Sequence, residues 1–471
     1  MGRRMHRPPS SAADAPLIPH ALRDRLLPLL GEEVATLEAA LSLPSPTSIR
    51  LNPLKTFLLK AEAVPWCSNG RYLQERPAFT FDPFLHAGAY YVQEPSSMLL
   101  ERAVLASGVF DRDVLALDLC AAPGGKSTHL LSLLSTGSLL IANEIDATRR
   151  HVLAENIWKH GASNAVITGS DPADLASLRS CFDLILIDAP CSGEGMFRKD
   201  PFARQQWSPA LVERCAVTQR KIVAHAWDAL APGGTLIYST CTWERTENEE
   251  QLAPLIQQGA HCLELALDPA WGIVRYEDHG VIGYRCFPHR LRGEGLFISV
   301  VRKPGEWRPR PLKGTHALIG TSGPAWLKGD TGTVVIEHGD LLHAMPSRWM
   351  PPMEEILRSM RVHAPGTPLA ERKGERWVPH AAAALSQWLD RSTFPEIAVD
   401  ETEALSYLRG EALPAHDASG PGLVTHKGLA LGWVHGAGKR WNNRWPAAWR
   451  IRGQRSKMPC VPWSERAGPK A

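Results

Sequence analysis

Residues 115–134, LALDLCAAPGGKSTHLLSLL, constrain the fold of this chain more than any other stretch. The apolar run 114–119 is short enough for a buried parallel strand, and leucines at helical spacing follow from Ser127. Between them, AAPGGK predicts a tight turn in which Gly124 and Gly125 keep side chains out of the path of the backbone. A strand, a glycine turn and a helix in this order are typical of the nucleotide-binding corner of a doubly wound α/β sheet. We therefore expect the first amides of the helix to point at a ligand above the strand ends.

The region around this corner alternates short apolar runs with helical patterns. Together these runs predict a Rossmann-like, mainly parallel, doubly wound α/β sheet of seven strands. The predicted strands cover residues 114–118, 139–144, 165–168, 183–188 and 235–239, with two further runs within 280–303 as a closing hairpin. We expect six segments: a disordered tail 1–18, an N-terminal α+β region 19–88, the sheet domain 89–304, a linker and middle module 305–395, a small C-terminal β barrel 396–457 and a tail 458–471.

The glycine turn is compatible with an adenosyl ligand and not with a phosphate-binding loop. A phosphate-binding loop needs its first glycine at position 120, where this chain has Cys120. Glu144 closes the next apolar run, where an acidic side chain can grip the two hydroxyls of a ribose. The alternative from this stretch alone is a glycine-rich turn that binds no ligand.

Two further loops place reactive groups just beyond the ends of predicted strands. Cys191 lies in APCSGEG after the strand 183–188, and Cys241 lies in STCT after the strand 235–239. Ligands bind at this edge of such sheets, so these two cysteines differ from those in apolar stretches, which are expected to be inert. Asp188 ends an all-apolar strand, which indicates a catalytic partner or, alternatively, the cap of the following turn.

Composition limits the other classes of function. The net charge of +3 decides nothing by itself, and no apolar run approaches the ~20 residues that a membrane-spanning helix needs. The nine cysteines are odd in number and include no C-x-x-C pair, which argues against a disulfide framework and against a zinc site. We therefore expect a cytoplasmic protein with no metal and no membrane contact, acting as a monomer.

Two groups of residues are candidates for contacts with RNA. Arg50 and Asn52 alternate with apolar neighbours in SIRLNPLK, which suits either an RNA-facing strand or a solvated strand edge. Near the C-terminus, basic residues interleave with tryptophans, a pattern suited to single-stranded or irregular RNA or, alternatively, to a tryptophan core with a basic rim. The candidates there are Lys439, Arg440, Arg444, Trp445 and Arg450.

AAPGGK, NEID, DAPCSGEG and STCT, in this order and spacing, resemble the motifs of the Sun-family RNA (cytosine-5) methyltransferases. The flanking stretches SIRLNPLK, YYVQEPSS and RCFPHRLRGEGLF resemble that family too, so the likeness covers about residues 48–303. The resemblance implies S-adenosylmethionine as cofactor, with Glu144 on its ribose, Asp171 on its adenine and Asp188 between cofactor and base. The loop that would wrap the cofactor is Cys120, Ala121, Ala122, Pro123, Gly124, Gly125 and Lys126.

The chemistry of this family explains a requirement for two cysteines. Carbon 5 of cytosine is a poor nucleophile until a thiolate adds to carbon 6 and converts it into an enamine carbon. By resemblance, Cys241 is the nucleophile and Cys191 assists release. DNA cytosine methyltransferases use the Pro-Cys cysteine instead, and the residues alone leave this choice open.

From residue 398 the chain resembles the PUA-like RNA-binding module of bacterial small-subunit rRNA enzymes of the same family. This resemblance implies 5-methylcytidine formation in 16S rRNA, with the small ribosomal subunit as partner. Three alternatives remain: a tRNA substrate, a non-catalytic ribosome assembly factor, and an exocyclic amino methyltransferase. A scaffold would have little use for Cys191, Cys241 and Asp188 together, and the last class would carry a D/N-P-P-Y loop at position 188.

Overall fold

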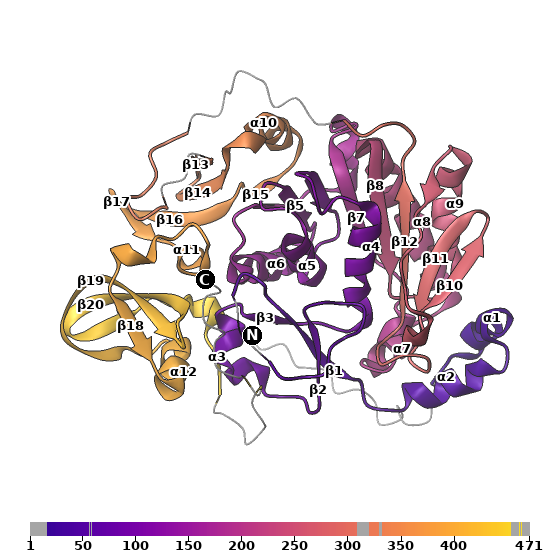
Figure 1. Cartoon of the computed structure of the whole chain (residues 1–471), viewed down its shortest axis with the longest axis horizontal. Helices are drawn as coiled ribbons and strands as arrows, with labels where there is room; N and C mark the ends of the chain where they lie inside the picture. The colour runs from indigo at the N-terminus through magenta and orange to yellow at the C-terminus, as the bar shows by residue number, and fades with distance from the viewer. Residues whose placement is uncertain are drawn as a thin grey trace, which may run out of the picture.

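The computed structural model describes residues 17–55, 57, 59–308, 320–328, 332–453, 461 and 463 (Figure 1). The N-terminal region begins with two helices, α1 (His20–Leu30) and α2 (Glu33–Leu41), which pack through a shared leucine cluster. Of the predicted tail 1–18, only residues 17 and 18 are described, and Ile18 is buried in that cluster. A small antiparallel sheet of order β2-β1-β3 follows, with the helix α3 (Pro83–His86) before its last strand. Its strands are β1 (Thr47–Leu51), β2 (Gly70–Leu73) and β3 (Tyr90–Val92).

The predicted doubly wound sheet is confirmed, and it is wider than seven strands. Its order is β10-β11-β12-β8-β7-β4-β5-β6-β15, with β9 paired beside β12. The five strands from β8 to β6 run parallel, while β12 and β11 form the predicted antiparallel hairpin. The strands are β4 (Leu115–Asp118), β5 (Leu139–Asn143), β6 (Ala165–Thr168), β7 (Phe182–Asp188), β8 (Leu230–Thr240), β9 (His261–Cys262), β10 (Val274–Asp278), β11 (Val281–Cys286), β12 (Leu296–Arg302) and β15 (Val362–Ala364).

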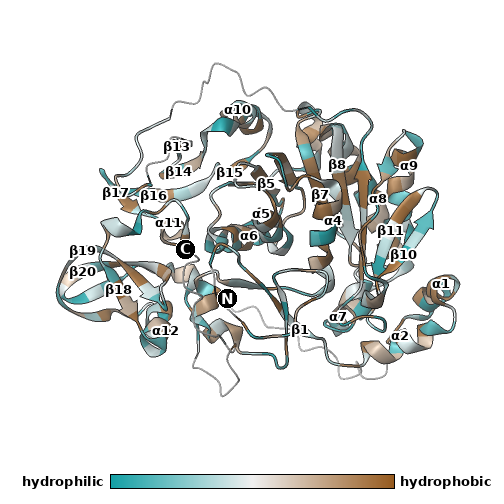
Figure 2. Ribbon diagram, in the orientation of Figure 1, coloured by the Kyte–Doolittle hydropathy of each residue, from teal (hydrophilic) through white to brown (hydrophobic). Residues whose placement is uncertain are grey.

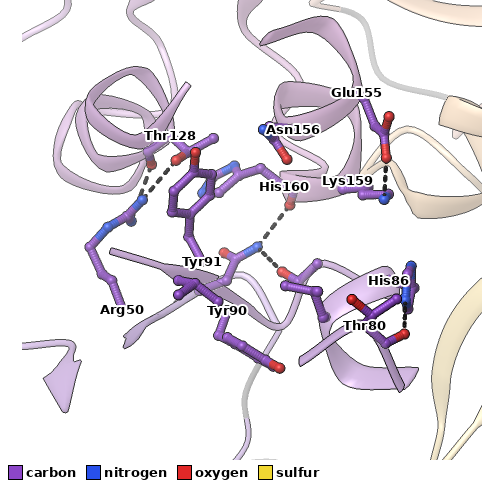
Figure 3. Close-up of a pocket in the computed structure, with 14 residues that line it drawn as sticks. Arg50, Thr80, His86, Tyr90, Tyr91, Thr128, Glu155, Asn156, Lys159 and His160 are labelled. Atoms are coloured by element: carbon purple, nitrogen blue, oxygen red, sulfur yellow. Dashed lines mark hydrogen bonds and ion pairs between the residues drawn. The ribbon is translucent and has the colours of Figure 1, made fainter. Parts of the chain in front are cut away.

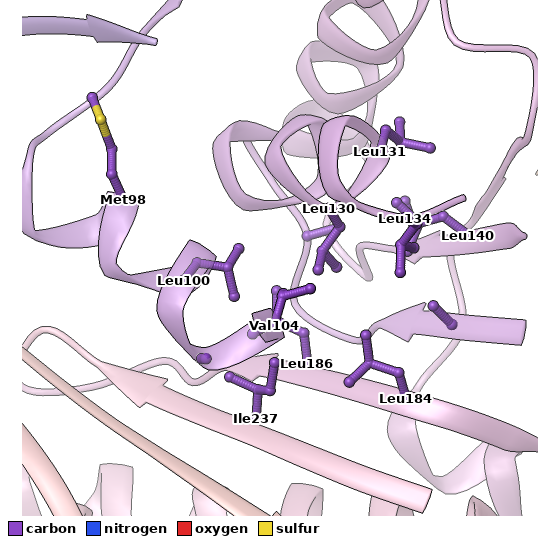
Figure 4. Packing of buried hydrophobic residues seen from close by; sticks show 14 of the residues in the cluster. Met98, Leu100, Val104, Leu130, Leu131, Leu134, Leu140, Leu184, Leu186 and Ile237 are labelled. Carbon is purple, nitrogen blue, oxygen red and sulfur yellow. The ribbon is translucent and has the colours of Figure 1, made fainter. Parts of the chain in front are cut away.

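Helices cover both faces of this sheet, so the central strands are mainly apolar (Figure 2). Along β4, Ala116 packs into the core on one face, while Leu115 and Leu117 pack into the core on the other. Figure 4 shows the first core, in which leucines from two helices lie over β7 and β8. The helices of this face are α4 (Leu100–Ser107), α5 (Gly125–Leu133) and α6 (Ala147–His160); α8 (Pro209–Ala229) and α9 (Glu249–Gln257) cover the other, and the short α7 is Pro201–Gln206.

The middle module is joined to the main sheet. Its strand β15 pairs antiparallel with β6 at the sheet edge, and its helix α10 (Met350–Ser359) packs into the core on the same face as α8, where it contacts residues 172–177. The rest forms a separate sheet of order β13-β14-β16-β17 and the helix α11 (Ala381–Leu385). The four strands are β13 (Thr333–His338), β14 (Leu341–Pro346), β16 (Thr367–Lys373) and β17 (Arg376–Pro379). Packing therefore continues across the expected boundary at residue 304.

The C-terminal module packs against the N-terminal region, far from it in sequence (Figure 1). Its long hairpin β19–β20 is flanked by the parallel strand β18, and α12 lies against α3. In the expected tail 458–471, Val461 and Trp463 are described, and the Trp463 ring stacks on Phe84. The elements are β18 (Glu396–Val399), α12 (Glu401–Arg409), β19 (Leu413–His426) and β20 (Leu429–Asn443). Among the described residues, no helix combines the length and the apolar character needed to cross a bilayer.

Candidate functional site

The loop between β4 and α5 lies at the carboxyl edge of the sheet, as the glycine turn predicts. Gly124 has φ +108°, in the left-handed region that favours glycine, and α5 begins at the next residue. A Cβ on Gly125 would lie 3.2 Å from the Tyr91 ring, so β3 closes one side of the loop. The loop is tied to the next strand because Ala121 N donates to Asn143 O at 2.8 Å. The start of α5 therefore offers free amides at the strand ends.

The two acidic residues expected to bind the cofactor lie at the ends of the next two strands. Glu144 is 3% exposed, and its carboxylate accepts from Asp146 N at 3.0 Å and pairs with Arg149 Nη1 at 3.2 Å. Arg149 Nη2 also donates to Ala122 O at 2.8 Å, so this arginine bridges the acid and the loop. Asp171 is exposed beyond β6, where its side chain accepts from Ala173 N at 2.9 Å. The sequence did not indicate the role of Arg149.

Asp188 is the last residue of β7, and its carboxylate lies between the end of β8 and the loop 120–126 (hereafter the cofactor loop), which joins β4 to α5. Its Oδ2 is 2.8 Å from Lys126 Nζ, on the first turn of α5, and its Oδ1 accepts from Ser239 Oγ at 2.8 Å. Burial lowers the pKa of Lys126, but the charge of Asp188 outweighs this effect and the net direction is upward. Lys126 is therefore a permanent cation next to the carboxylate. The sequence suggested only a loop residue at this position.

Cys191 and Cys241 meet across the carboxyl ends of β7 and β8. Their sulfur atoms lie 3.0 Å apart, both are free thiols, and both are partly exposed. Cys241 N also donates to Cys191 Sγ at 3.3 Å. Contact with Cys241, followed by burial, raises the pKa of Cys191 well above its ordinary value. Cys191 is therefore held as a thiol beside Cys241.

Two buried carboxylates, those of Glu194 and Glu247, fix the loop after β7 that carries Cys191. The sequence did not indicate this role. The Glu247 carboxylate accepts from Ser192 N at 3.0 Å and from Gln219 Nε2 at 2.8 Å, and it also bonds the Ser192 hydroxyl. Glu194 is fully buried and accepts from Ser192 Oγ at 2.8 Å and from Trp243 N at 3.1 Å. Burial raises its pKa to about 7. These bonds join the loop after β7 to the loop after β8.

Glycine at position 195 brings the same two loops together. Gly195 N donates to Cys241 O at 2.7 Å, and a Cβ on this residue would lie 2.3 Å from Gly295 O. Any larger residue would push the loops apart and change the distance between the two sulfurs. The GEG portion of the Cys191 loop is therefore required for backbone approach.

The expectation that Arg50 faces RNA is corrected by its burial. Arg50 is 1% exposed and lies under the first turn of α5 (Figure 3). It donates to Gln93 Oε1 at 2.7 Å, to Thr128 Oγ1 at 2.7 Å and to Gly125 O at 3.2 Å. Its guanidinium therefore holds the helix that begins at the cofactor loop.

Asn52 is also a structural residue. It is 4% exposed, and its Nδ2 donates to Gly88 O at 2.8 Å and to His160 O at 2.9 Å. These bonds tie the end of β1 to the end of α6, and neither of the two earlier alternatives for this residue, an RNA-facing strand or a solvated edge, is correct.

The C-terminal candidates separate into exposed cations and one buried ring. Trp445 is 3% exposed, donates to Trp449 O at 3.1 Å and packs on Tyr407, so the expectation that it contacts RNA is corrected in favour of a core position. The cations that remain free to meet phosphates are exposed: Lys439, Arg440, Arg444 and Arg450.

A cavity of about 370 Å³ between β3, α5 and α6 is separate from these groups (Figure 3). Tyr91, Asn156, Lys159 and His160 are among the residues that line it. Neither cysteine, nor Asp188 or Glu144, borders this cavity. It is therefore not the catalytic cleft.

Family models of known proteins match three regions of the chain. A family described as 16S rRNA methyltransferase RsmB/F matches residues 109–302. The N-terminal domain of 16S rRNA methyltransferase RsmF matches residues 18–95, and the methyltransferase RsmF PUA domain matches residues 394–451.

Individual relatives cover nearly the full length. Ribosomal RNA small subunit methyltransferase F of Erwinia tasmaniensis is 31% identical over 86% of this chain and 90% of its own length. The protein of the same name from Enterobacter sp. is 33% identical over 87% of this chain and 90% of its own length. Among solved structures, a methyltransferase homolog protein from Pyrococcus horikoshii shares 26% identity with a TM-score of 0.50, over 59% of this chain and 93% of that one.

Proposed function

Because the chain belongs to the family of ribosomal RNA small subunit methyltransferases F, we propose that it forms 5-methylcytidine in 16S rRNA through a cysteine adduct. As a member of this family it is an S-adenosylmethionine-dependent rRNA methyltransferase. The observation that carries the finer proposal is the 3.0 Å contact between Cys191 and Cys241, at the strand end that also carries Asp188. Two thiols beside an acid suit a reaction of covalent addition followed by elimination.

S-adenosylmethionine supplies an electrophilic methyl group when it is bound. The donor set at the strand ends fits this molecule, since it combines the amides at the start of α5 with carboxylates at the ends of β5 and β7. We propose that the 120–126 loop wraps it, Glu144 holds its ribose hydroxyls and Asp171 meets its adenine. The bridge from Arg149 to Glu144 and Ala122 would then fix both the acid and the loop.

In the proposed reaction, the Cys241 thiolate bonds to carbon 6 of an unstacked cytosine. The electron pair of the 5,6 double bond moves to carbon 5, which then takes the methyl group. We expect the ion pair of Lys126 and Asp188 to meet this base, with Lys126 donating to the ring nitrogen, where negative charge builds up, and Asp188 accepting from the exocyclic amine. A base, here solvent water, then takes the carbon 5 proton, and the electron pair of that C–H bond re-forms the 5,6 double bond. The bond between sulfur and carbon 6 breaks at the same time, and Cys241 leaves as a thiolate.

Cys191 is suited to the second half of this sequence. Its raised pKa keeps its thiol protonated, which makes it a poor nucleophile but leaves a proton to share with the departing sulfur. Hydrogen bonds to Glu194 and Glu247 hold this loop rigidly, so the Cys191 sulfur is positioned before the substrate binds. The choice of Cys241 as nucleophile follows the family resemblance.

The test uses single and double cysteine variants with 16S rRNA or small ribosomal subunits and labelled S-adenosylmethionine. Cys241→Ala should transfer no methyl group and form no covalent species. Cys191→Ala should still allow addition and methyl transfer but stall at elimination, so a protein–RNA adduct accumulates and migrates slowly on a denaturing gel. The double variant should form none, because the adduct needs Cys241.

Cys262→Ala is the matched control, since Cys262 is a partly exposed thiol on β9, near the amino end of β8 and away from its carboxyl end, and this variant should behave like the parent. An adduct from Cys241→Ala and none from Cys191→Ala would reverse the two roles. Methyl transfer by the double variant would eliminate the thiolate mechanism. Sequencing of bisulfite-treated rRNA would identify the product as 5-methylcytidine or exclude it.

A further inference from the structure

Three potential metal ligands that are far apart in the sequence meet in the core beside the cofactor loop. Cys67 lies in the loop before β2, Glu101 lies on α4, and His129 lies on α5. Their exposed fractions are 1%, 5% and 1%. One donor atom from each lies within 4.8 Å of the others, and among the described residues this is the only such group of three found. Neither the methyl-transfer chemistry nor the RNA-binding surface uses these side chains.

The separations between donor atoms suit a tetrahedral cation. Cys67 Sγ is 3.8 Å from His129 Nε2, and this nitrogen is 3.5 Å from Glu101 Oε2. Zinc bonds of about 2.3 Å to sulfur and about 2.0–2.1 Å to nitrogen or oxygen place neighbouring ligand atoms about 3.3–3.6 Å apart. The two separations from His129 are therefore within a few tenths of an ångström of tetrahedral spacing, and the donor atoms of Cys67 and Glu101 lie within 4.8 Å of each other.

Backbone amides already hold two of these ligands in place. Ser68 N donates to both oxygens of Glu101, at 3.0 and 3.2 Å, and the Asn69 amide bonds the Cys67 sulfur. Gly70 N donates to Cys67 O at 3.0 Å, which closes a tight turn around the cysteine. Amide bonds to a ligating sulfur and carboxylate are the usual outer support of a metal site.

The charges of the cluster also suit a divalent cation. A neutral imidazole, a carboxylate and a thiolate are the ligand forms that such an ion binds. A carboxylate and a thiolate together balance a charge of two, and the proton that Cys67 loses on binding passes to solvent.

We propose that Cys67, Glu101 and His129 bind a structural Zn²⁺ that fastens α4 and α5 to the N-terminal region. The second oxygen of Glu101 or a water completes the fourth position. The prediction of no zinc site relied on the lack of a C-x-x-C pair. Ligands as far apart in the sequence as these three cannot be recognised from such a spacing. An ion here would fix the helix whose first turn forms the cofactor loop.

The full-length protein is purified without metal-affinity resin, and its zinc is measured by mass spectrometry. The Cys191→Ala/Cys241→Ala double variant provides the background, because the catalytic sulfurs are close enough to bind zinc on their own. That background should retain a stoichiometric amount of zinc and, when loaded with Co²⁺, show the near-ultraviolet band of a thiolate–cobalt bond. Adding Cys67→Ala should remove both signals, whereas adding Cys181→Ala, at a buried cysteine outside the cluster, should leave them intact.

A chelator should lower the thermal midpoint of the background protein and leave that of the Cys67→Ala variant unchanged. If Cys67→Ala does not fold, zinc content and the cobalt band of the background protein alone decide the question. Absence of both after reconstitution with metal would overturn the proposal and leave a hydrogen-bonded core cluster in which Arg50 balances Glu101. Zinc that persists after Cys67→Ala would overturn it as well.

Discussion

Arg50→Ala separates a structural role from an RNA-binding role at one position. The side chain makes five hydrogen bonds inside a core that leaves it 1% exposed, and those to Gln93, Thr128 Oγ1 and Gly125 measure 2.7, 2.7 and 3.2 Å. Bonds from a charged donor contribute roughly 1.5–3 kcal/mol each, but burial of the guanidinium offsets part of this. Burial also lowers the pKa of Arg50 to about 10. We expect a net loss of about 3–5 kcal/mol, as for other buried charged networks that lose one member.

This loss should be concentrated where Arg50 acts. Gly125 and Thr128 belong to the first turn of α5, which ends the cofactor loop, so hydrogen exchange of the α5 amides should accelerate. If about 1.4 kcal/mol of the loss is expressed as disorder of that turn, the affinity for S-adenosylmethionine falls about tenfold. Calorimetric titration with the cofactor measures this directly.

Arg440→Ala is the comparison, because Arg440 is an exposed arginine of the C-terminal module. It should keep the exchange pattern and cofactor affinity of the parent and lose only RNA affinity. Our reasoning would be refuted if Arg50→Ala left the hydrogen exchange of α5 and the cofactor affinity unchanged and weakened RNA binding. That result would show that Arg50 contacts RNA and does not support α5.

Two further predictions concern the RNA surface and the buried acid. Replacing Lys439, Arg440 and Arg444 together by Ala should weaken RNA binding. It should also lower the slope of log affinity against log salt concentration by the equivalent of up to about three phosphate contacts, with cofactor affinity as control. An unchanged salt slope in filter binding would make the module structural only. The pKa of Glu194 is raised to about 7 by burial, so between pH about 4.5 and 7 the folded chain holds a proton that the unfolded chain has released. The free energy of unfolding should therefore fall as pH rises across that window, by at most about 3 kcal/mol. Glu194→Gln should flatten this dependence on pH, as measured by urea unfolding. The same dependence on pH in the variant and the parent would contradict this.

The strand ends were predictable because parallel strands covered on both faces have a distinctive composition. Residues 184–187 are apolar without interruption, so the first acid after them, Asp188, marks the edge of the sheet. The same argument applied to Glu144, and Cys191 and Cys241 follow their strands within a few residues. The two sulfurs meet because β7 and β8 are neighbours, an arrangement that the alternation of strands and helices favours.

Arg50, Asn52 and Trp445 could not be assigned in this way. Alternation along β1 indicates that two faces exist, but it does not show what covers each face. All but one of the hydrogen bonds of Arg50 go to α5, and one partner of Asn52 is the carbonyl of His160 at the end of α6. A polar side chain in a short strand is usually exposed, and here two helices later in the chain bury both.

The difference between predicted and missed residues therefore follows from the physics of the site. The groups that we propose to meet the substrates lie at strand ends, where the change from apolar to polar is visible in a single sequence. Groups that position them, such as Glu194, Glu247 and Arg149, are charged side chains whose partners come from other loops. A buried charge is tolerated only when its partners are in place, so its role is a property of the assembled fold. Substitutions at these supporting residues should therefore disturb the fold and the chemistry together, whereas Cys241→Ala should disturb the chemistry alone.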